Sequence, residues 1–285
     1  MSEHNAIEVR NVSKNFKKFN LQDISFDLPM GCVLGLIGEN GAGKSTTIRL
    51  IMNSLKRDGG TIRVLGADNQ DKSFQQIKND IGVVMDEAYF PAVINTQIVD
   101  KMMAAVYDNW SSQTFRKYVN KFDLPEKQPF KEYSRGMRMK LSIAVALSHD
   151  PKLLILDEAT SGLDPIIRDE ILDIFNDFTR EPDHSILISS HILSDLEKLC
   201  DYIAFIHKGR IVFCEEKDQL MEKYGLISCG QKEFEDIPQE AVCSKRSTDY
   251  GVNCLVRRDM VSQAFDIERA TIEDIMLFYV KGEER

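Results

Sequence analysis

A glycine-rich segment, GENGAGKST at residues 38–46, directly follows the apolar run CVLGLI and strongly limits what this chain can fold into. Glycine loses more backbone entropy on folding than any other residue, so three glycines in nine positions indicate a backbone that approaches another group closely. Gly38, four intervening residues, and then Gly43, Lys44 and Ser45 match the pattern G-x-x-x-x-G-K-[ST]. In that pattern successive backbone N–H groups curl around the phosphates of a nucleotide.

The segments on either side of this loop provide the context that phosphate binding requires. A strand precedes the loop, and a helix predicted from about Ser45 to Leu55 would point its positive N-terminal end at the same anion. Lys44 would add a point charge at the β- and γ-phosphates, and the Ser45 hydroxyl would hold Mg²⁺. The alternative is an ordinary glycine-rich turn, and the flanking strand and helix favour nucleotide binding over it.

Composition narrows the class of protein. The chain has 285 residues, enough for one or two domains, and its 36 basic and 45 acidic residues give a net charge of −9. An acidic balance argues against a dedicated nucleic-acid binder, so no nucleic-acid partner is expected. Six cysteines without a C-x-x-C pair indicate reduced thiols in a cytosolic protein. The polar N-terminus and the lack of an apolar run of roughly 20 residues predict neither a signal peptide nor a membrane span.

The order of predicted elements indicates an α/β fold. Two alternating strands precede the phosphate loop, and short apolar strands then alternate with helices up to about residue 216. This order predicts a mainly parallel sheet between layers of helices, with an inserted helical subdomain near residues 90–150. After about residue 220 the sequence becomes more polar. We therefore expect a boundary there, followed by a small C-terminal α/β extension at 221–285.

Two carboxylates follow the apolar strand LLIL at residues 153–156. Asp157 and Glu158 would lie at the carboxyl end of a buried strand, where open α/β sheets bind their ligands. Asp157 is a suitable oxygen ligand for Mg²⁺, and Glu158 is then placed to polarise a water towards the γ-phosphate. The alternative is a pair of carboxylates at an ordinary strand end, and the phosphate loop upstream argues against it.

Three further segments identify a family. YSRGMRMKLSIAVAL precedes LLILDE, SGLD follows it, and SILISSH places His191 at the end of the next strand. In this order and spacing, residues 6–220 resemble the ATP-binding subunit of ABC transporters. The resemblance implies an α/β fold with a P-loop NTPase core and an antiparallel β subdomain, and an ATPase domain at 1–220. The segment ATIEDIMLFYV is similar to the closing segment of the drug- and antibiotic-export branch.

The resemblance implies a role for each matching residue. Lys44, the catalytic Glu158 and the switch histidine His191 would serve ATP hydrolysis, and Ser45 and Asp157 would hold Mg²⁺. Nucleotide contacts are implied for the Walker A segment, whose members are Gly38, Asn40, Gly41, Ala42, Gly43, Lys44, Ser45 and Thr46. Ser134 and Gly136, from the signature motif, would contact the γ-phosphate bound to a second ATP-binding subunit.

Two positions depart from the family pattern. The signature LSGGQ is replaced by Tyr133-Ser134-Arg135-Gly136-Met137, with a bulky arginine where the family has glycine. In the Q-loop segment IGVVMDE, Asp86 stands where glutamine is usual. We expect a working but slower signature, and an Asp86 that contacts the nucleotide, Mg²⁺ or water.

An aromatic ring that stacks on adenine is expected in the first strand pair. Phe16, 22 residues before Gly38, is the first candidate and Phe19 the second, and the alternative for Phe16 is a core position. Stacking needs no phenol hydroxyl, so phenylalanine is competent.

The resemblance implies an ATPase that powers a membrane transporter, with export favoured. A separate membrane-spanning subunit and a second ATP-binding subunit, identical or related, are the implied partners. The chain would then lie on the cytoplasmic face of the cell membrane. The alternatives are a soluble ABC-type ATPase in assembly or repair, and a P-loop small-molecule kinase; the serine and glycine before LLILDE count against the kinase.

Overall fold

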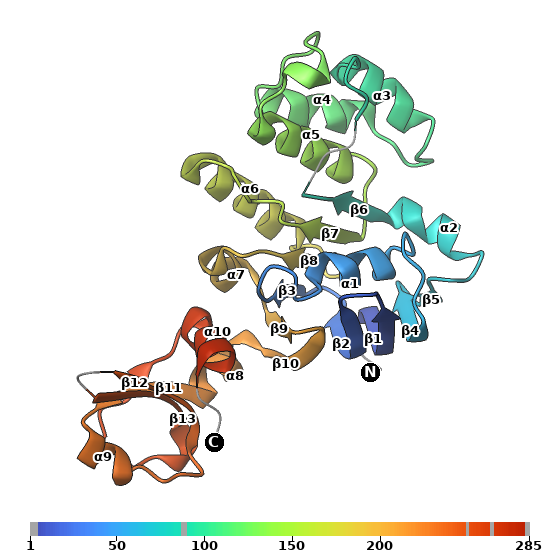
Figure 1. The fold of residues 1–285 in the computed structure, drawn as a ribbon. Coiled ribbons are helices and arrows are strands. Elements are labelled where there is room, and N and C mark those ends of the chain that lie inside the picture. The colour runs from blue at the N-terminus through green and yellow to red at the C-terminus, as the bar shows by residue number, and fades with distance from the viewer. Residues whose placement is uncertain (1–4, 87–89, 249–250, 263–264, 283–285) are drawn as a thin grey trace. The chain divides into compact units, whose positions relative to one another are not determined.

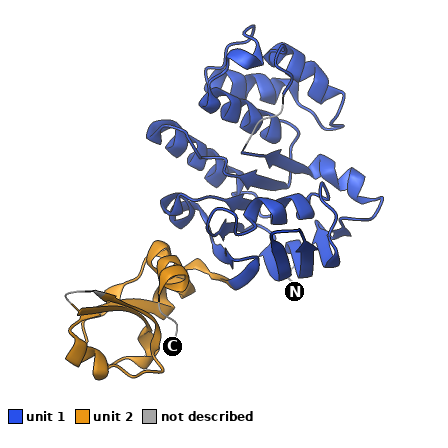
Figure 2. Cartoon of the chain, viewed as in Figure 1, with its two compact units in different colours: residues 1–212 blue, residues 213–285 orange. Residues whose placement is uncertain are grey.

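The computed structural model describes residues 5–86, 90–248, 251–262 and 265–282. The chain forms two compact units, residues 1–212 and residues 213–285, coloured blue and orange in Figure 2. The domain boundary predicted at 220/221 falls inside a helix of the second unit, Lys217–Lys223. The division into an ATPase domain and an extension remains a functional prediction.

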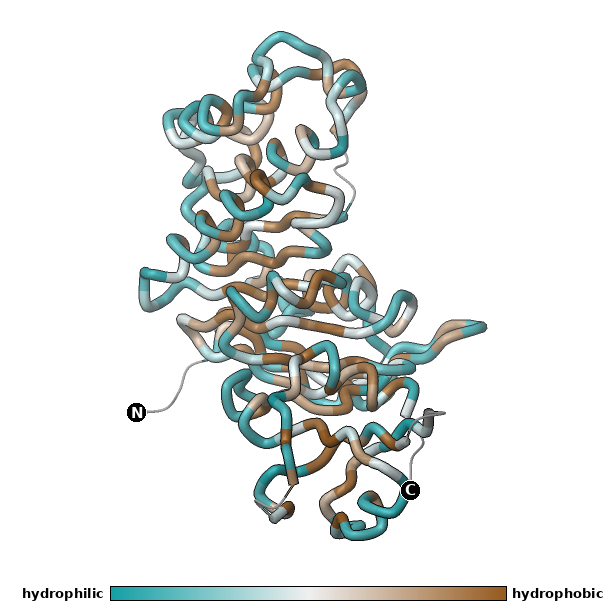
Figure 3. The backbone as a smooth tube through the Cα atoms, turned by 90° about the vertical axis from the view of Figure 1, so that its left-hand side faces the viewer, coloured by the Kyte–Doolittle hydropathy of each residue, from teal (hydrophilic) through white to brown (hydrophobic). Residues whose placement is uncertain are grey.

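A largely parallel sheet forms the centre of the first unit, in the strand order β10-β9-β3-β8-β7-β6. Every residue of β3, β7 and β8 is buried, as expected of parallel strands covered on both faces. Figure 3 shows the hydrophobic residues gathered along these interior strands. The strands are β3 (Val33–Ile37), β6 (Ile81–Val84), β7 (Leu153–Asp157), β8 (Ser185–Ser189), β9 (Tyr202–His207) and β10 (Arg210–Glu216).

A second sheet in this unit is antiparallel, with the order β2-β1-β4-β5. Its central strand pairs Val9 with Phe26 on one side and with Ile62 on the other, and all three side chains are buried. The strands are β1 (Asn5–Asn15), β2 (Asn20–Pro29), β4 (Gly59–Val64) and β5 (Ala67–Asp68).

Helices of the first unit begin at side-chain caps where the sequence provides them. Asn95, Ser111, Ser134 and Asp164 each accept a hydrogen bond from the N–H three residues later. The helices α3 to α5 form a separate group at one end of this unit (Figure 1). The helical segments are α1 (Lys44–Ile51), α2 (Phe74–Ile77), η1 (Lys78–Asp80), α3 (Thr96–Ala104), α4 (Ser112–Lys121), η2 (Phe130–Glu132), α5 (Arg135–Leu147), α6 (Pro165–Phe178) and α7 (Leu193–Leu199).

The second unit is a small α/β structure around a four-stranded sheet in the order β12-β13-β11-β14. Ile227, Phe234 and Val252 belong to its own apolar core. Burial raises the pKa of the Cys254 thiol to about 12, so this cysteine is not a nucleophile at neutral pH. Its elements are α8 (Lys217–Lys223), β11 (Tyr224–Cys229), α9 (Gln231–Glu235), β12 (Val242–Thr248), β13 (Gly251–Arg257), η3 (Arg258–Met260), β14 (Glu268–Arg269) and α10 (Ile272–Lys281).

The predicted fold class is confirmed. The parallel core, the antiparallel β subdomain, the inserted helices and the C-terminal α/β unit are all present. The helix after the glycine-rich loop is shorter than predicted, because it ends at Ile51.

A fully buried histidine joins the helical group to η1, the short helix that precedes β6. The ring of His149 stacks on Tyr107 at 4.0 Å between centroids, and its Nδ1 lies 3.0 Å from the carbonyl oxygen of Asn79. Burial lowers the pKa of His149 below the ordinary 6.5, although the hydrogen bond to Asn79 acts in the opposite direction. Just below pH 6.5 His149 is therefore protonated in the unfolded chain but remains neutral in the folded chain.

This histidine predicts an acid-sensitive stability. The free energy of unfolding should fall as the pH drops below 6.5, with a slope of at most about 1.4 kcal/mol per pH unit for this proton. His149→Asn keeps a donor for Asn79 but removes the titrating group, so its stability should depend less steeply on pH. Urea unfolding between pH 8 and pH 5 measures both slopes, with His184→Asn, which changes a partly exposed histidine, as the matched control. Equal slopes for wild type and His149→Asn would contradict the assignment.

Candidate nucleotide-binding site

The glycine-rich loop joins β3 to α1, and each of its glycines has a positive φ: +156° at Gly38, +83° at Gly41 and +118° at Gly43. A Cβ at Gly38 would overlap the carbonyl oxygen of Ile206, and one at Gly43 would lie 2.5 Å from Leu21 Cδ2. Packing therefore requires two of the glycines. Gly41 has no atom near that position, so its requirement is conformational and it leaves the backbone open to a ligand.

Lys44 lies inside this loop and is almost fully buried. Its Nζ donates hydrogen bonds to the carbonyl oxygens of Gly38 at 2.8 Å and Glu39 at 3.3 Å. Burial lowers the pKa of Lys44, and the nearby Glu158 and Asp157 partly oppose that shift. A buried ammonium at the N-terminus of α1 is suited to an anion, because the helix dipole and free N–H groups favour negative charge at the same place.

Asp157, at the end of β7, links the loop to the central sheet. Its Oδ1 accepts hydrogen bonds from Ser45 Oγ at 3.2 Å and from Ser189 Oγ at 2.6 Å, and its side chain is buried. Ser45 belongs to α1, and Ser189 ends β8, the strand paired with β7. The network places a hydroxyl and a carboxylate side by side at the carboxyl end of the sheet.

Glu158, the residue after β7, has a φ of +56°, a conformation that non-glycine residues seldom adopt. Its backbone N–H donates to the carbonyl oxygen of Ser189 at 3.0 Å, which holds this turn against β8. The Nδ1 of His191 lies 2.5 Å from Glu158 Oε2, and the backbone N–H of His191 lies 3.4 Å from the same oxygen. Because the carboxylate accepts, Nδ1 carries the proton in this contact.

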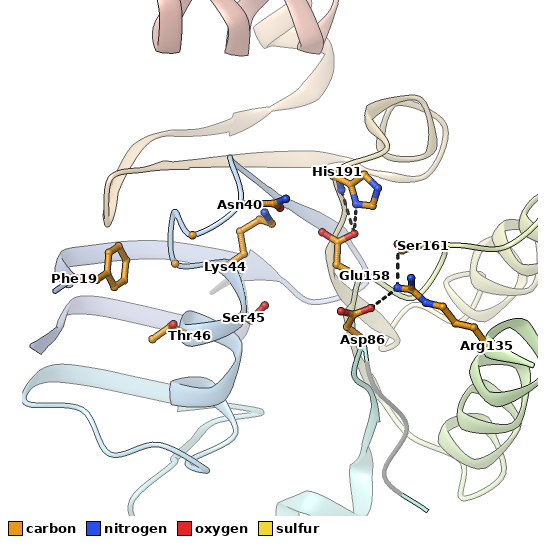
Figure 4. A pocket seen from close by; sticks show the side chains of 12 residues that line it. Phe19, Asn40, Lys44, Ser45, Thr46, Asp86, Arg135, Glu158, Ser161 and His191 are labelled. Atoms are coloured by element: carbon orange, nitrogen blue, oxygen red, sulfur yellow. Dashed lines mark hydrogen bonds and ion pairs between the residues drawn. The ribbon is translucent and has the colours of Figure 1, made fainter. Parts of the chain in front are cut away.

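One cavity of about 540 Å³ brings most of the predicted residues together (Figure 4). Its lining residues are Phe19, Asn40, Gly41, Gly43, Lys44, Ser45, Thr46, Asp86, Arg135, Glu158, Ser161 and His191. Asp157 lies beneath this surface and reaches the site through Ser45. Ala42 does not line it: its N–H donates to the carbonyl oxygen of Glu39, and its carbonyl oxygen accepts from Gly209.

The two aromatic candidates differ in position. Phe19 lines the cavity, and a Cβ at Gly43 would lie 3.1 Å from its Cζ. Phe16 is 41% exposed and not a core residue; it stacks on Phe19 at 6.4 Å and lines a neighbouring hollow together with Asn40 and Gly41. Both rings thus lie beside the glycine-rich loop.

The signature residues lie at the N-terminus of α5. Ser134 is the N-cap, accepting a hydrogen bond from the N–H of Met137 at 3.2 Å, and it is exposed. Ser134 and Gly136 do not line the cavity, whereas Arg135 between them does. The sequence analysis assigned no contact to Arg135 or Ser161. For Arg135, the replacement of the usual glycine by arginine could have indicated a contact in the site.

Asp86 and Arg135, the two departures from the family pattern, contact each other. Arg135 Nη2 donates to Asp86 Oδ1 at 2.8 Å and lies 3.4 Å from Ser161 Oγ (Figure 4). Asp86 follows β6, and Ser161 lies in the turn between β7 and α6. A single guanidinium therefore joins three segments that border the cavity.

Known proteins are similar to this chain in sequence and in fold. The family model for ABC transporters matches residues 21–161. The lantibiotic transport ATP-binding protein SrtF of Streptococcus pyogenes is 36% identical over 215 residues, covering 74% of this chain and 91% of that protein. The bacitracin transport ATP-binding protein BcrA of Enterococcus faecalis is 32% identical, covering 73% of this chain and 68% of that protein.

This chain belongs to the ABC transporter ATP-binding family. A solved ATP-binding subunit of an ABC transporter is 27% identical with a TM-score of 0.69, covering 75% of this chain and 91% of that one. An ATP-binding cassette bound to ADP and Pi shares the fold at 19% identity, with a TM-score of 0.65 and 74% and 98% of the two chains covered.

The predicted family and activity are confirmed. As a member of this family the chain is an ATP-binding and ATP-hydrolysing subunit of a transporter. The alternatives, an assembly or repair ATPase and a small-molecule kinase, receive no support from these relatives. Among the residues that the structure describes, no helix has the length and apolar character to cross a membrane.

The hydrogen bond from Ser189 to Asp157 generates a prediction. Ser189→Ala should lower kcat for ATP hydrolysis about tenfold, because the Asp157 carboxylate loses the donor that orients it. Ser185→Ala is the matched control, because Ser185 is equally buried on β8 but donates nothing to the site. Steady-state kinetics of both variants provide the comparison, and equal losses in the two would assign Ser189 a purely structural role.

Proposed function

We propose that this subunit hydrolyses ATP at the cavity around Lys44 and that hydrolysis drives export through a separate membrane-spanning subunit. The observation that carries the proposal is the grouping of a buried lysine, the Ser45–Asp157 pair and the Glu158–His191 pair beside one glycine-rich loop. The names of the lantibiotic and bacitracin transport relatives support export of antibiotic-like cargo.

Within the site, each group has a proposed task. Lys44 and the N-terminus of α1 bind the phosphates, with backbone contacts from the loop through Gly38, Asn40, Gly41, Gly43, Ser45 and Thr46. Ala42 is left out of this set, because its N–H and carbonyl oxygen are paired with Glu39 and Gly209. Glu158 accepts a hydrogen bond from the attacking water and orients it, and His191 holds the Glu158 carboxylate in place. Positioning and charge neutralisation supply most of the rate enhancement in phosphoryl transfer, so no covalent intermediate on the protein is required.

Mg²⁺ fits the oxygen atoms at this site. The Ser45 hydroxyl and the Asp157 carboxylate are the hard ligands that this ion prefers, and Mg²⁺ usually takes one or two carboxylates together with phosphate and water oxygens. When bound, the ion neutralises charge on the phosphates. The assignment of Asp86 to the metal is also a proposal; Asp86 lines the cavity, and its Oδ1 is engaged by Arg135.

For the adenine ring we propose stacking on the aromatic pair beside the loop. Phe16 is the first candidate because its ring is 41% exposed beside the loop. Phe19 is the second candidate, because it lines the main cavity and its ring stacks on Phe16.

A second ATP-binding subunit, identical or related, is proposed as a partner. Ser134 and Gly136 do not line this chain's own cavity, and Ser134 is exposed at a helix N-terminus, where an anion is favoured. This position suits a γ-phosphate bound to another subunit.

Trapping ATP tests the proposed site and dimer together. Glu158→Gln keeps the shape of the side chain but removes the carboxylate, so ATP should persist and hold two chains together, whereas ADP should not. Light scattering after gel filtration should show a dimer only with ATP. Adding Ser134→Arg should abolish the dimer while leaving ATP affinity within about threefold, and adding Lys44→Ala should abolish ATP binding itself.

A Glu158→Gln chain that stays monomeric at saturating ATP, alone and with a related ATP-binding subunit, would contradict the proposal.

The membrane-spanning partner is proposed to contact α3. Ile98, Met102 and Val106 are spaced by four residues along and just beyond this helix, with exposures of 41%, 38% and 63%. Val93, which precedes the helix, is 77% exposed. The opposite face of α3 packs inward, where Asp100 accepts hydrogen bonds from Trp110 and Ser112. Contact with such a partner would hold this subunit at the cytoplasmic face of the membrane.

Charge substitution on this surface tests the contact. Ile98→Asp with Met102→Asp should lower co-purification with the proposed membrane-spanning subunit roughly tenfold, because carboxylates would be buried against apolar groups. Met260→Asp, at a residue 41% exposed in the second unit, is the matched control. ATP affinity should be unchanged in both, and undiminished co-purification would remove α3 from the interface.

A further inference from the structure

Two residues that interrupt family motifs form an ion pair with each other. Asp86 replaces the expected glutamine and Arg135 the expected glycine, and Arg135 Nη2 lies 2.8 Å from Asp86 Oδ1. They are 49 positions apart in the sequence, so the contact is a product of the fold. A glycine at position 135 would have no side chain to reach Asp86.

The pair also contacts a third segment. Arg135 Nη2 lies 3.4 Å from Ser161 Oγ, and a Cβ on Gly162 would lie 3.2 Å from Arg135 Nε. The guanidinium therefore lies against the turn that follows Glu158. The N–H of Ser161 donates to the carbonyl oxygen of Glu158 at 3.0 Å, which makes a short path from Arg135 to the proposed catalytic carboxylate.

Arg135 occupies an unfavourable place for a cation. It is the first residue of α5, where the helix dipole repels positive charge, and the first turn of this helix contains no acidic residue. Asp86 supplies from another segment the negative charge that the helix itself lacks. The side chains are 58% and 49% exposed, so such a pair adds little to folding stability.

We propose that Arg135 and Asp86 act as one positioning unit, which ties the N-terminus of α5 to the two segments bordering this chain's own nucleotide site. Nucleotide binding in this chain's own site thereby affects the position of Ser134, the neighbour of Arg135. This inference rests on the proposed function, because Ser134 matters only if it contacts the nucleotide of a second subunit.

A double-mutant cycle tests whether the two residues act together. Asp86→Asn and Arg135→Gln each remove the charge with little change in size. Each should lower kcat about tenfold, and the KM for ATP should stay within about threefold. The double variant should lose no more than a single variant, because the same contact is absent from all three.

A similar ion pair elsewhere provides the control. Arg10 and Asp27, on β1 and β2, are joined at 2.5 and 2.8 Å, have exposures of 46% and 39%, and lie outside the cavity. Arg10→Gln and Asp27→Asn should leave kcat within about twofold of wild type. A loss near hundredfold in the Asp86→Asn, Arg135→Gln double variant, or a loss under twofold in either single variant, would overturn the proposal.

Hydrogen exchange separates this inference from the proposed function. A non-hydrolysable ATP analogue is added at a chain concentration where light scattering shows monomers, and exchange is followed in the segments 38–51 and 134–147. Wild type should gain protection in 38–51 and change protection in 134–147; Asp86→Asn and Arg135→Gln should keep only the first response. An unresponsive 38–51 segment in wild type would refute the proposed function. A response there without one in 134–147 would refute the positioning unit alone.

Discussion

The buried carboxylate of Asp157 is the contact on which the rest of the site depends. Its Oδ1 takes hydrogen bonds from α1 through Ser45 and from β8 through Ser189, so the phosphate loop, β7 and β8 are fixed to one atom. A buried carboxylate is costly unless its oxygens are satisfied, and this network satisfies Oδ1 with two hydroxyl donors. The same oxygens are then pre-oriented for a cation, because the groups that stabilise the carboxylate also hold it still.

Much of the fold follows from patterns that the sequence displays directly. VLGLI is apolar throughout, and LLILD and SILIS are apolar except at their ends. Each becomes a strand buried on both faces of a parallel sheet. The place of a site residue is equally predictable where that residue directly follows a strand. Lys44 and Ser45 follow a strand, Asp157 and Glu158 end another, and carboxyl ends of parallel strands meet at one edge.

Contacts between distant segments could not be read in this way. Arg135 was expected only to disturb the signature, and Asp86 to contact the nucleotide, Mg²⁺ or water. Their pairing depends on how α5 approaches the end of β6, which periodicity does not specify. Phe19 was ranked second for a similar reason. It lies close to Gly43 because the antiparallel sheet packs against the loop, and this distance cannot be predicted from the spacing of residues in the sequence.

The backbone at Glu158 connects the proposed catalytic role of this residue with the folding stability of the chain. A positive φ at a non-glycine residue strains the chain by about 1–3 kcal/mol, and the neighbouring β8 holds the residue in that conformation. Glycine would relieve the strain but could not carry a carboxylate. With the role in hydrolysis proposed for Glu158, this side chain serves catalysis at a cost in folding stability, and a chain that no longer hydrolyses ATP would become more stable by losing it. Chains that bind nucleotide without turning it over should accordingly accumulate glycine or asparagine here.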